Sequence, residues 1–183
     1  MRRLIALALL CLSLAACPQR QAPAPLVELP PLRLAPAALG HELSVQQKLH
    51  FRFGTQQREL DALLEVDASE VRLAVQALGQ TGVSLHWDGV ELTQQRASWL
   101  PEAVRSERVL DDLQFVLWPA DAIRAALPPD WRLEEQAGTR RLLRGETVWL
   151  SATPLDARRV QLENLAERYS LEIESADIGA PAP

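Results

Sequence analysis

The feature that most constrains the fold of this 183-residue chain is a regular alternation of apolar and polar residues. From Ser44 onward, apolar side chains recur at every second position, as in strands with one buried and one solvated face. The links between the first five segments are short, such as Gly54-Thr55-Gln56 and Asp88-Gly89. Short links make consecutive strands antiparallel neighbours, so the pattern predicts a meander. Its apolar face should carry Leu49, Phe51, Phe53, Leu60, Ala62, Leu64, Val66, Val71, Leu73, Val75, Ala77, Val83, Leu85 and Trp87.

One stretch, residues 109–131, interrupts this alternation. Leu110, Leu113 and Leu117 share a helical stripe, and Ile123 and Leu127 continue a second one. A proline at 119 separates the two stripes, because proline can open a helix but not continue one. The stretch therefore predicts two short helices. They are either an ordinary core helix pair or a lid over an apolar cavity.

Strand-like alternation resumes at Trp131 and runs to Ile173, although the segment from Val160 to Ala166 is compatible with a strand or a helical turn. We therefore expect nine to eleven strands and no β-α-β unit. An antiparallel sheet of this size must coil, close or split. The predicted fold is mainly β (α+β), a strongly curved, incomplete antiparallel β-barrel with a central helical lid.

The N-terminus has the pattern of a bacterial lipoprotein signal. Arg2 and Arg3 precede an apolar run that is too short to span a bilayer permanently. The run ends in Leu14-Ala15-Ala16-Cys17, where small residues directly precede a cysteine. Residues 1–16 are thus predicted to be a signal peptide, and Cys17 to carry the lipid anchor.

The rest of the chain divides by composition. Residues 17–43 are rich in proline and are expected to form a spacer whose second half packs on the domain, with a short helix near Pro36 to Leu39. Residues 44–175 form the predicted half-barrel domain, and residues 176–183 a frayed tail.

Charge and cysteine content exclude several functions. After cleavage the chain has 17 basic and 24 acidic side chains, a formal charge of -7. This acidity argues against a nucleic-acid partner. Removal of Cys11 with the signal leaves Cys17 as the last thiol, so we expect no disulfide and no thiolate metal site.

The sequence shows no catalytic or metal-binding constellation. His41, His50 and His86 are far apart and match no metal-binding spacing. Asp111 and Asp112 point about 100° apart on a helix, so we interpret them as charges near a helix N-terminus. We therefore predict no enzyme, no cofactor and no metal. The arginines are interpreted as a solvated face or, alternatively, as contacts to anionic lipid headgroups: Arg105, Arg108, Arg124, Arg140, Arg141 and Arg144.

The aromatic residues leave two interpretations open. They are few for a lining that must fill a wide curved sheet, and an underfilled lumen is a ligand cavity. Alternatively they are ordinary packing, and the protein is a structural or adaptor lipoprotein of an envelope complex with a filled core.

In combination, these features resemble the LolB-like outer-membrane lipoproteins. The lipobox, the proline-containing spacer, the meander and the segment Leu117 to Pro128, with its Leu-Trp-Pro-x-x-x-Ile-Arg-x-x-Leu-Pro pattern, carry the resemblance. The chain is more similar to the LolB-like lipoproteins that accompany aryl-polyene lipid gene clusters than to LolB itself. In LolB an apolar residue on a protruding loop enters the membrane, whereas the corresponding loop here, residues 67–70, has no leucine.

The resemblance implies a monomer at the periplasmic face of the outer membrane of a Gram-negative bacterium, anchored through Cys17 in the inner leaflet. It would bind an acyl or polyene lipid, or the acyl group of a lipoprotein, without catalysis, and would receive it from a LolA-like periplasmic carrier. Trp99 and Leu100 are the candidate membrane-contact loop. The expected cavity and lid residues are Phe51, Phe53, Leu64, Leu73, Val75, Leu85, Trp87, Phe115, Leu117, Trp118, Ile123, Leu127 and Trp131.

Overall fold

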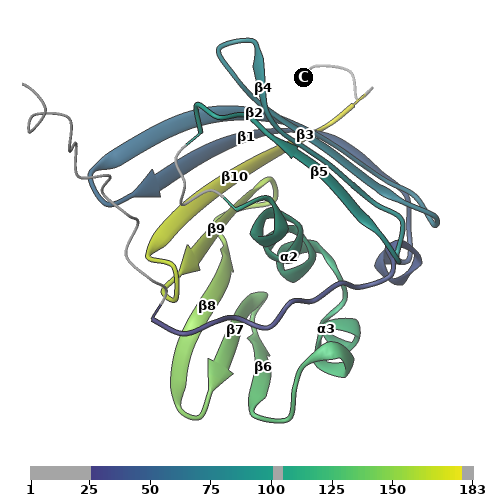
Figure 1. Cartoon of the computed structure of the whole chain (residues 1–183). Coiled ribbons are helices and arrows are strands. Elements are labelled where there is room, and N and C mark those ends of the chain that lie inside the picture. Colours follow the sequence, from purple (N-terminus) through teal and green to yellow (C-terminus); the bar gives the residue numbers. More distant parts are fainter. Residues whose placement is uncertain (1–25, 101–104, 179–183) are drawn as a thin grey trace, which may run out of the picture.

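The computed structural model describes residues 26–100 and 105–178, and these form a curved sheet around two helices (Figure 1). Five strands precede the helices: β1 (Leu43–Phe53), β2 (Gln56–Val66), β3 (Val71–Ala77), β4 (Gln80–Trp87) and β5 (Leu92–Arg96). The helices are α2 (Ser106–Leu117) and α3 (Ala120–Ala126). Five strands follow: β6 (Trp131–Gln136), β7 (Thr139–Arg144), β8 (Thr147–Pro154), β9 (Arg159–Asn164) and β10 (Tyr169–Asp177).

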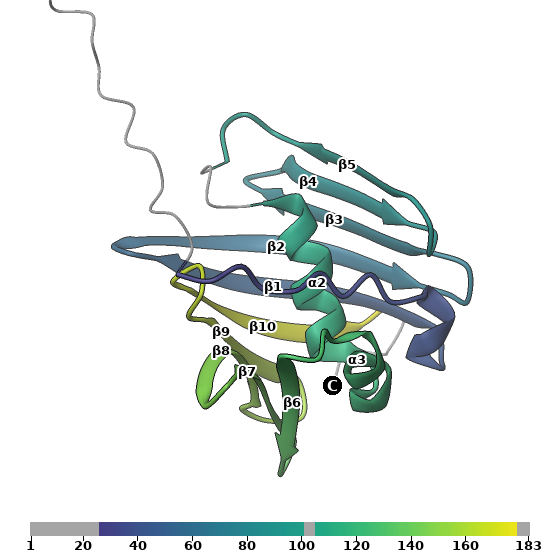
Figure 2. The same cartoon turned by 60° about the horizontal axis from the view of Figure 1, so that its bottom comes forward.

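All ten strands belong to one antiparallel sheet with the order β5-β4-β3-β2-β1-β10-β9-β8-β7-β6. The sheet consists of two meanders joined where the first and last strands pair, with Val45 opposite Asp177 and Phe53 opposite Tyr169. The edge strands β5 and β6 do not pair, and the chain crosses between them through α2 and α3. The predicted curved, incomplete barrel with a helical lid is therefore confirmed, and α2 crosses its concave side (Figures 1 and 2).

The alternation in the sequence accounts for the faces of the strands. In β3, Val71, Leu73 and Val75 are buried while Arg72 and Gln76 are exposed. In β2 the apolar residue that breaks the alternation, Leu63, lies on the solvated face and is exposed. The segment from Val160 to Ala166, left open between strand and helical turn, is part of strand β9 as far as Asn164.

Helix α2 is buried at every residue from Leu110 to Phe115, so more than one of its sides is covered, and it ends before Pro119. Its last turn is held by Arg140 of β7, whose Nη1 donates to the carbonyls of Phe115, Val116 and Trp118 at 2.9, 3.0 and 2.7 Å. A cation there satisfies carbonyls that lack partners within the helix and complements the helix dipole.

An N-terminal strap, residues 26–35, crosses the open side of the barrel beside α2 (Figure 2). It buries three leucines, Leu29, Leu32 and Leu34, and leads into the 3-10 helix η2 (Pro36–Leu39). The prediction of a frayed tail from 176 is wrong for its first residues. Ala176 and Asp177 continue β10 opposite β1, because backbone pairing with β1 is available to them.

Among the described residues, no helix combines the length and the apolar character needed to cross a lipid bilayer.

Candidate functional site

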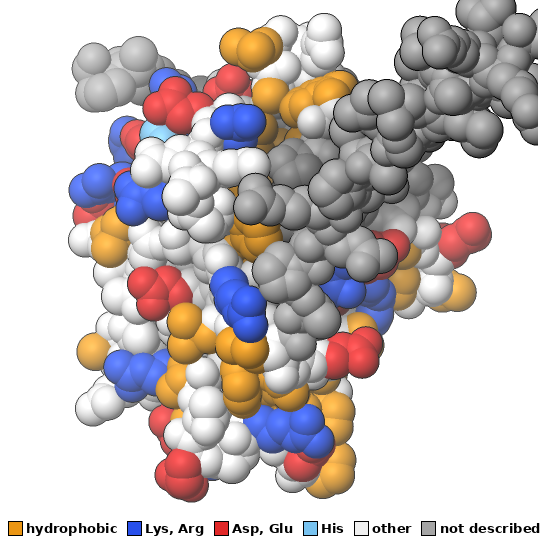
Figure 3. Space-filling view, turned by 60° about the vertical axis from the view of Figure 1, so that its left-hand side comes forward, with side chains coloured by type: hydrophobic (Ala, Val, Ile, Leu, Met, Phe, Trp, Pro, Cys, Tyr) orange, Lys and Arg blue, Asp and Glu red, His pale blue; other side chains and the backbone are white. Residues whose placement is uncertain are grey.

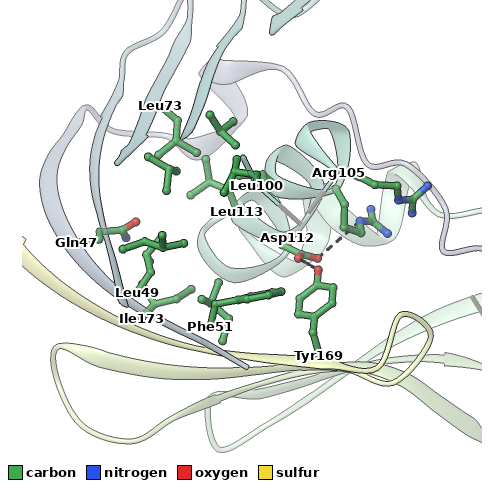
Figure 4. Close-up of a pocket in the computed structure, with 16 residues that line it drawn as sticks. Gln47, Leu49, Phe51, Leu73, Leu100, Arg105, Asp112, Leu113, Tyr169 and Ile173 are labelled. Atoms are coloured by element: carbon green, nitrogen blue, oxygen red, sulfur yellow. Dashed lines mark hydrogen bonds and ion pairs between the residues drawn. The ribbon is translucent and has the colours of Figure 1, made fainter. Parts of the chain in front are cut away.

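An apolar cavity lies between the N-terminal half of α2 and the concave face of the sheet (Figure 4). Strands β1 to β4 and β10 supply one wall, α2 supplies the other, and Leu100 closes one side. The lining residues are Gln47, Leu49, Phe51, Leu60, Leu73, Val75, Val83, Leu100, Arg105, Arg108, Val109, Asp112, Leu113, Tyr169, Leu171 and Ile173.

The cavity is narrow, with a volume of about 100 Å³. Sites for drug-sized ligands typically enclose ~300–1,000 Å³. The enclosed space therefore fits a segment of one hydrocarbon chain and not the two or three acyl chains of a lipoprotein.

One end of the cavity is polar. The Tyr169 hydroxyl donates a hydrogen bond to Asp112 Oδ2, and Arg108 forms an ion pair with Asp111 (Figure 4 shows the Asp112–Tyr169 contact). Arg33 of the strap also pairs with Asp111, at 2.7 Å between Nη1 and Oδ1. Since Asp111 and Asp112 are buried six and seven residues into α2, their interpretation as helix N-terminal charges is wrong.

Burial controls the protonation of this cluster. Desolvation raises the pKa of Asp112 to about 7, although Arg108 and the Tyr169 hydroxyl oppose the shift. Desolvation also raises the pKa of Asp111, and desolvation together with Asp112 raises that of Tyr169 well above its ordinary value. For Arg108, burial lowers the pKa, but Asp112 and Asp111 outweigh it and leave the pKa raised.

Three of the predicted sheet residues line the cavity: Phe51, Leu73 and Val75. The prediction is wrong for the other five. Phe53 is half-buried at the end of β1, beyond the cavity. The remaining four are buried in the core elsewhere in the sheet: Leu64, Leu85, Trp87 and Trp131.

The lid prediction is wrong at the level of residues, because the C-terminal half of α2 packs tightly where a void was expected. Phe115, Trp118 and Ile123 are fully buried, and Leu117 and Leu127 are half-buried against the core. The strap packs against this part of the lid, where Gln114 and Trp118 are hydrogen-bonded to it. Its carbonyls also accept hydrogen bonds from two buried indoles, Trp118 Nε1 to Ala35 O at 3.0 Å and Trp87 Nε1 to Leu34 O at 2.8 Å.

Several lining residues were missed, for two different reasons. For some of them the alternation identifies the apolar face but not which part of the strand borders the cavity: Leu49, Leu60, Val83, Leu171 and Ile173. The polar residues Arg108, Asp112 and Tyr169 gave no such signal, because Tyr169, which bonds to Asp112, lies 57 positions away in the sequence.

The candidate membrane-contact loop needs a correction too. Leu100 is only 7% exposed and lines the cavity, so it is not a surface residue. Trp99 is 46% exposed, and its ring lies over Gly82, where a Cβ would approach it to 3.0 Å. The apolar residue that protrudes is Leu78, fully exposed at the tip of the β3–β4 hairpin, where φ is 51°.

The arginines do not form one basic patch. Arg108 and Arg140 are engaged with buried groups, Arg124 pairs with Asp121 and Arg144 with Asp130. On the face shown in Figure 3, basic, acidic and hydrophobic side chains are interspersed. Within residues 26–100 and 105–178, no three His, Cys, Asp or Glu side chains are grouped as metal ligands.

The predicted lipid anchor, Cys17, lies outside the described residues. A comparison with curated proteins found no match. Residues 44–177, nearly the whole sheet with its helices, match the profile of a family described as a protein of unknown function, DUF3261. Because that match covers well over half of the sequence, the chain belongs to the DUF3261 family.

Proposed function

We propose that this protein is a periplasm-facing outer-membrane lipoprotein that binds one acyl or polyene chain in the cavity under α2, without catalysis. The observation that carries the proposal is a mostly apolar cavity near one end of the sheet. Exposed apolar side chains lie at that same end. The resemblance to LolB-like lipoproteins points the same way.

The geometry of that end supports contact with a membrane. The β1–β2, β3–β4 and β9–β10 turns lie at one end of the sheet, because Phe53 pairs with both Gln56 and Tyr169, and Asp61 pairs with Gln76. The exposed apolar side chains at this end are Leu26, Leu78, Trp99 and Leu165. Leu26 is fixed there by a hydrogen bond from its N–H to Ala166 O at 2.9 Å, so the chain leads towards Cys17 from the same end.

The chemistry of the lining favours binding over catalysis. Among the described residues, the sixteen that line the cavity include no serine, threonine, cysteine, lysine or histidine. The acidic group, Asp112, is bonded to Tyr169 and faces Arg108. Each methylene removed from water contributes ~0.8 kcal/mol, so even a short segment of one chain gains appreciably from entering the cavity.

This proposal includes Cys17 as the membrane anchor and a LolA-like periplasmic protein as the source of the ligand. The cavity volume restricts that ligand to one chain, or to one chain of a larger lipid. The apolar end of the sheet would face the inner leaflet of the outer membrane, which gives the ligand a short path between membrane and cavity.

A matched pair of valines on α2 tests the proposal. Val109 lines the cavity, whereas Val116, two turns later, is half-buried and does not. Val109→Phe should fill the space and abolish binding of a fluorescent fatty-acid probe, while Val116→Phe should bind the probe as the unmodified chain does. Thermal melts of both variants control for folding. Equal probe binding by the two variants would contradict the site.

A second candidate function is a non-enzymatic adaptor in an envelope complex. It is favoured by the tight packing of Phe115, Trp118 and Ile123 and by a cavity volume below that of typical ligand sites. The same assay separates the two functions, because an adaptor with a filled core would bind no apolar probe in any variant.

A further inference from the structure

Two polar atoms at the inner end of the cavity are buried without a hydrogen-bond partner among the described residues. They are Nε of Arg108 and Oδ1 of Asp112. The two side chains belong to residues that line the cavity, and both are more than nine-tenths buried. A buried polar atom without a partner costs about 1–3 kcal/mol, so such a pair beside a cavity points to a ligand group.

Other polar atoms of these two side chains already have partners, so they are not available to a ligand. Asp112 Oδ2 accepts from the Tyr169 hydroxyl, and Arg108 Nη2 is paired with Asp111 Oδ2. Arg108 Nε and Asp112 Oδ1 form an ion pair at 3.7 Å, which is too far for a hydrogen bond between them. One oxygen lying to the side of this pair, at about 2.8 Å from each atom, could accept from Arg108 and donate to Asp112.

We propose that the Arg108–Asp112 pair holds the hydroxyl group of a single-chain amphiphile whose hydrocarbon part fills the cavity. The hydroxyl oxygen accepts from Arg108 Nε, and its hydrogen is donated to Asp112 Oδ1. This inference rests on the proposed function and adds the chemical class of the ligand's head group.

The charges around the pair favour a neutral head group. The two arginines, Arg33 and Arg108, balance Asp111 and Asp112, and Arg105 is paired with Glu167. A carboxylate would add an uncompensated negative charge to a desolvated site. An ether could accept from Arg108 but would leave Asp112 Oδ1 without a donor.

Both atoms are shielded in the structure, so the head group needs a small side-chain movement to reach them. The terminal torsion of aspartate is broad, and the inference requires small rotations of both side chains that turn Oδ1 of Asp112 and Nε of Arg108 towards the cavity. The Tyr169 hydroxyl can follow this rotation, because a hydroxyl turns to suit its acceptor.

Two isomers of the same size test the inference. 1-Octanol and heptyl methyl ether contain the same atoms, but only the alcohol can donate a hydrogen bond. Each competes for a fluorescent apolar probe on the full mature chain at pH 8, with octane and octanoate as further competitors. We expect the alcohol to bind about tenfold or more tightly than the ether, since hydrogen bonds to charged groups contribute ~1.5–3 kcal/mol. Octanoate should bind more weakly than the alcohol.

Variants of Asp112 and Tyr169 test which side chain causes the preference for the alcohol. Asp112→Ala should remove the preference for the alcohol and leave octane binding in place. Tyr169→Phe should retain the preference, because it leaves Asp112 Oδ1 unchanged. The comparison of isomers on the unmodified chain needs no variant to fold.

The outcomes distinguish this inference from the proposed function. If the probe and all four compounds fail to bind, the proposed function fails and the inference with it. If alcohol, ether and octane bind equally, the cavity holds apolar chains but the Arg108–Asp112 pair does not recognise a hydroxyl. Tighter binding of octanoate than of octanol would overturn the inference in favour of an anion site.

Discussion

The side-chain amide of Gln114 is hydrogen-bonded to both backbone groups of Leu34. Its Oε1 accepts from Leu34 N at 2.9 Å, and its Nε2 donates to Leu34 O at 2.8 Å. Gln114 is fully buried, so the amide acts towards the strap as the backbone of a neighbouring strand would. Lid and strap are therefore one unit, which Asp111 and Trp118 also hold together through hydrogen bonds to Leu32 and Ala35.

Gln114→Leu should break this unit. Leu34 O keeps the hydrogen bond from Trp87, but Leu34 N–H loses its partner in a buried place. We expect a loss of about 1–3 kcal/mol in the free energy of unfolding. Urea unfolding measures it, with the exposed Gln95→Leu as the control. A loss no larger than that of the control would show that the leucines of the strap and its other hydrogen bonds, such as that of Leu32 N–H with Asp111, hold it without Gln114.

Arg140→Met should destabilise the end of α2. The substitution keeps most of the apolar stem but leaves the carbonyls of Phe115, Val116 and Trp118 without their shared donor. Because the lost hydrogen bonds involve a charged group, we expect a loss of about 2–3 kcal/mol. Thermal or urea unfolding of Arg141→Met, on the exposed neighbouring residue, should stay within about 0.5 kcal/mol of the unmodified chain.

Leu78→Glu should weaken association with lipid vesicles. Leu78 is fully exposed at the end of the sheet that the proposed function directs towards the membrane, and burying a leucine is worth about 1.5–3 kcal/mol. Flotation with anionic vesicles, using a chain without acyl groups, should show a loss of about tenfold or more. Val90→Glu, at a hairpin tip at the opposite end where the side chain is 89% exposed, should have no effect. Equal losses would remove the argument for this orientation.

Stability should decrease as the pH rises, because Asp112 titrates at about 7 in the folded state and near 3.8 when unfolded. Between these values the folded state binds more protons, so the free energy of unfolding falls with rising pH, by up to ~4 kcal/mol. Asp111, with its raised pKa, acts in the same direction. Asp112→Asn should flatten the profile and raise the melting temperature at pH 8. Asp61→Asn, on the solvated face, should leave the profile unchanged, and a stability maximum above pH 7 would contradict the assignment.

Cys17→Ala should release the protein from membranes. The sequence Leu14-Ala15-Ala16-Cys17 after an apolar run is the basis for the predicted anchor. Cell fractionation should find the variant in the soluble periplasmic fraction and the unmodified chain with the outer membrane. Sedimentation of the variant with membranes would contradict the anchor.

The sheet could be predicted from the sequence because alternation is local. Val71, Leu73 and Val75 identify a strand and its buried face without knowledge of any other part of the chain. The pairing of β1 with β10 could not be predicted. The alternation identifies the buried face of each strand but not which strand lies at either of its edges, and β1 and β10 lie more than 100 residues apart.

The candidate site was predicted only in outline for a similar reason. The alternation correctly assigns Phe51, Leu73 and Val75 to the face of the sheet that lines the cavity. The tight half of the lid was missed because the strap's carbonyls give the buried indoles of Trp87 and Trp118 their acceptors, a contact that no periodicity encodes. Asp112 was interpreted as a helix-end charge because its hydrogen-bond partner Tyr169 and the strap and sheet that bury it become neighbours only in the folded chain.

The pairing of the first strand with the last also sets the order of assembly. During synthesis, β1 emerges early and pairs with β2, but its other edge stays unpaired until residues 169–177 have been made. An unpaired edge is a template for association with other chains, and contacts this distant in sequence form slowly. The polar and charged side chains that alternate along β1, among them Lys48 and Arg52, keep one face of this strand solvated while its second edge is unpaired. A circular permutant that opens the chain between β5 and α2 and joins residue 178 to residue 26 through an added linker would place β10 shortly before β1 and keep the strap. It should therefore refold faster and aggregate less.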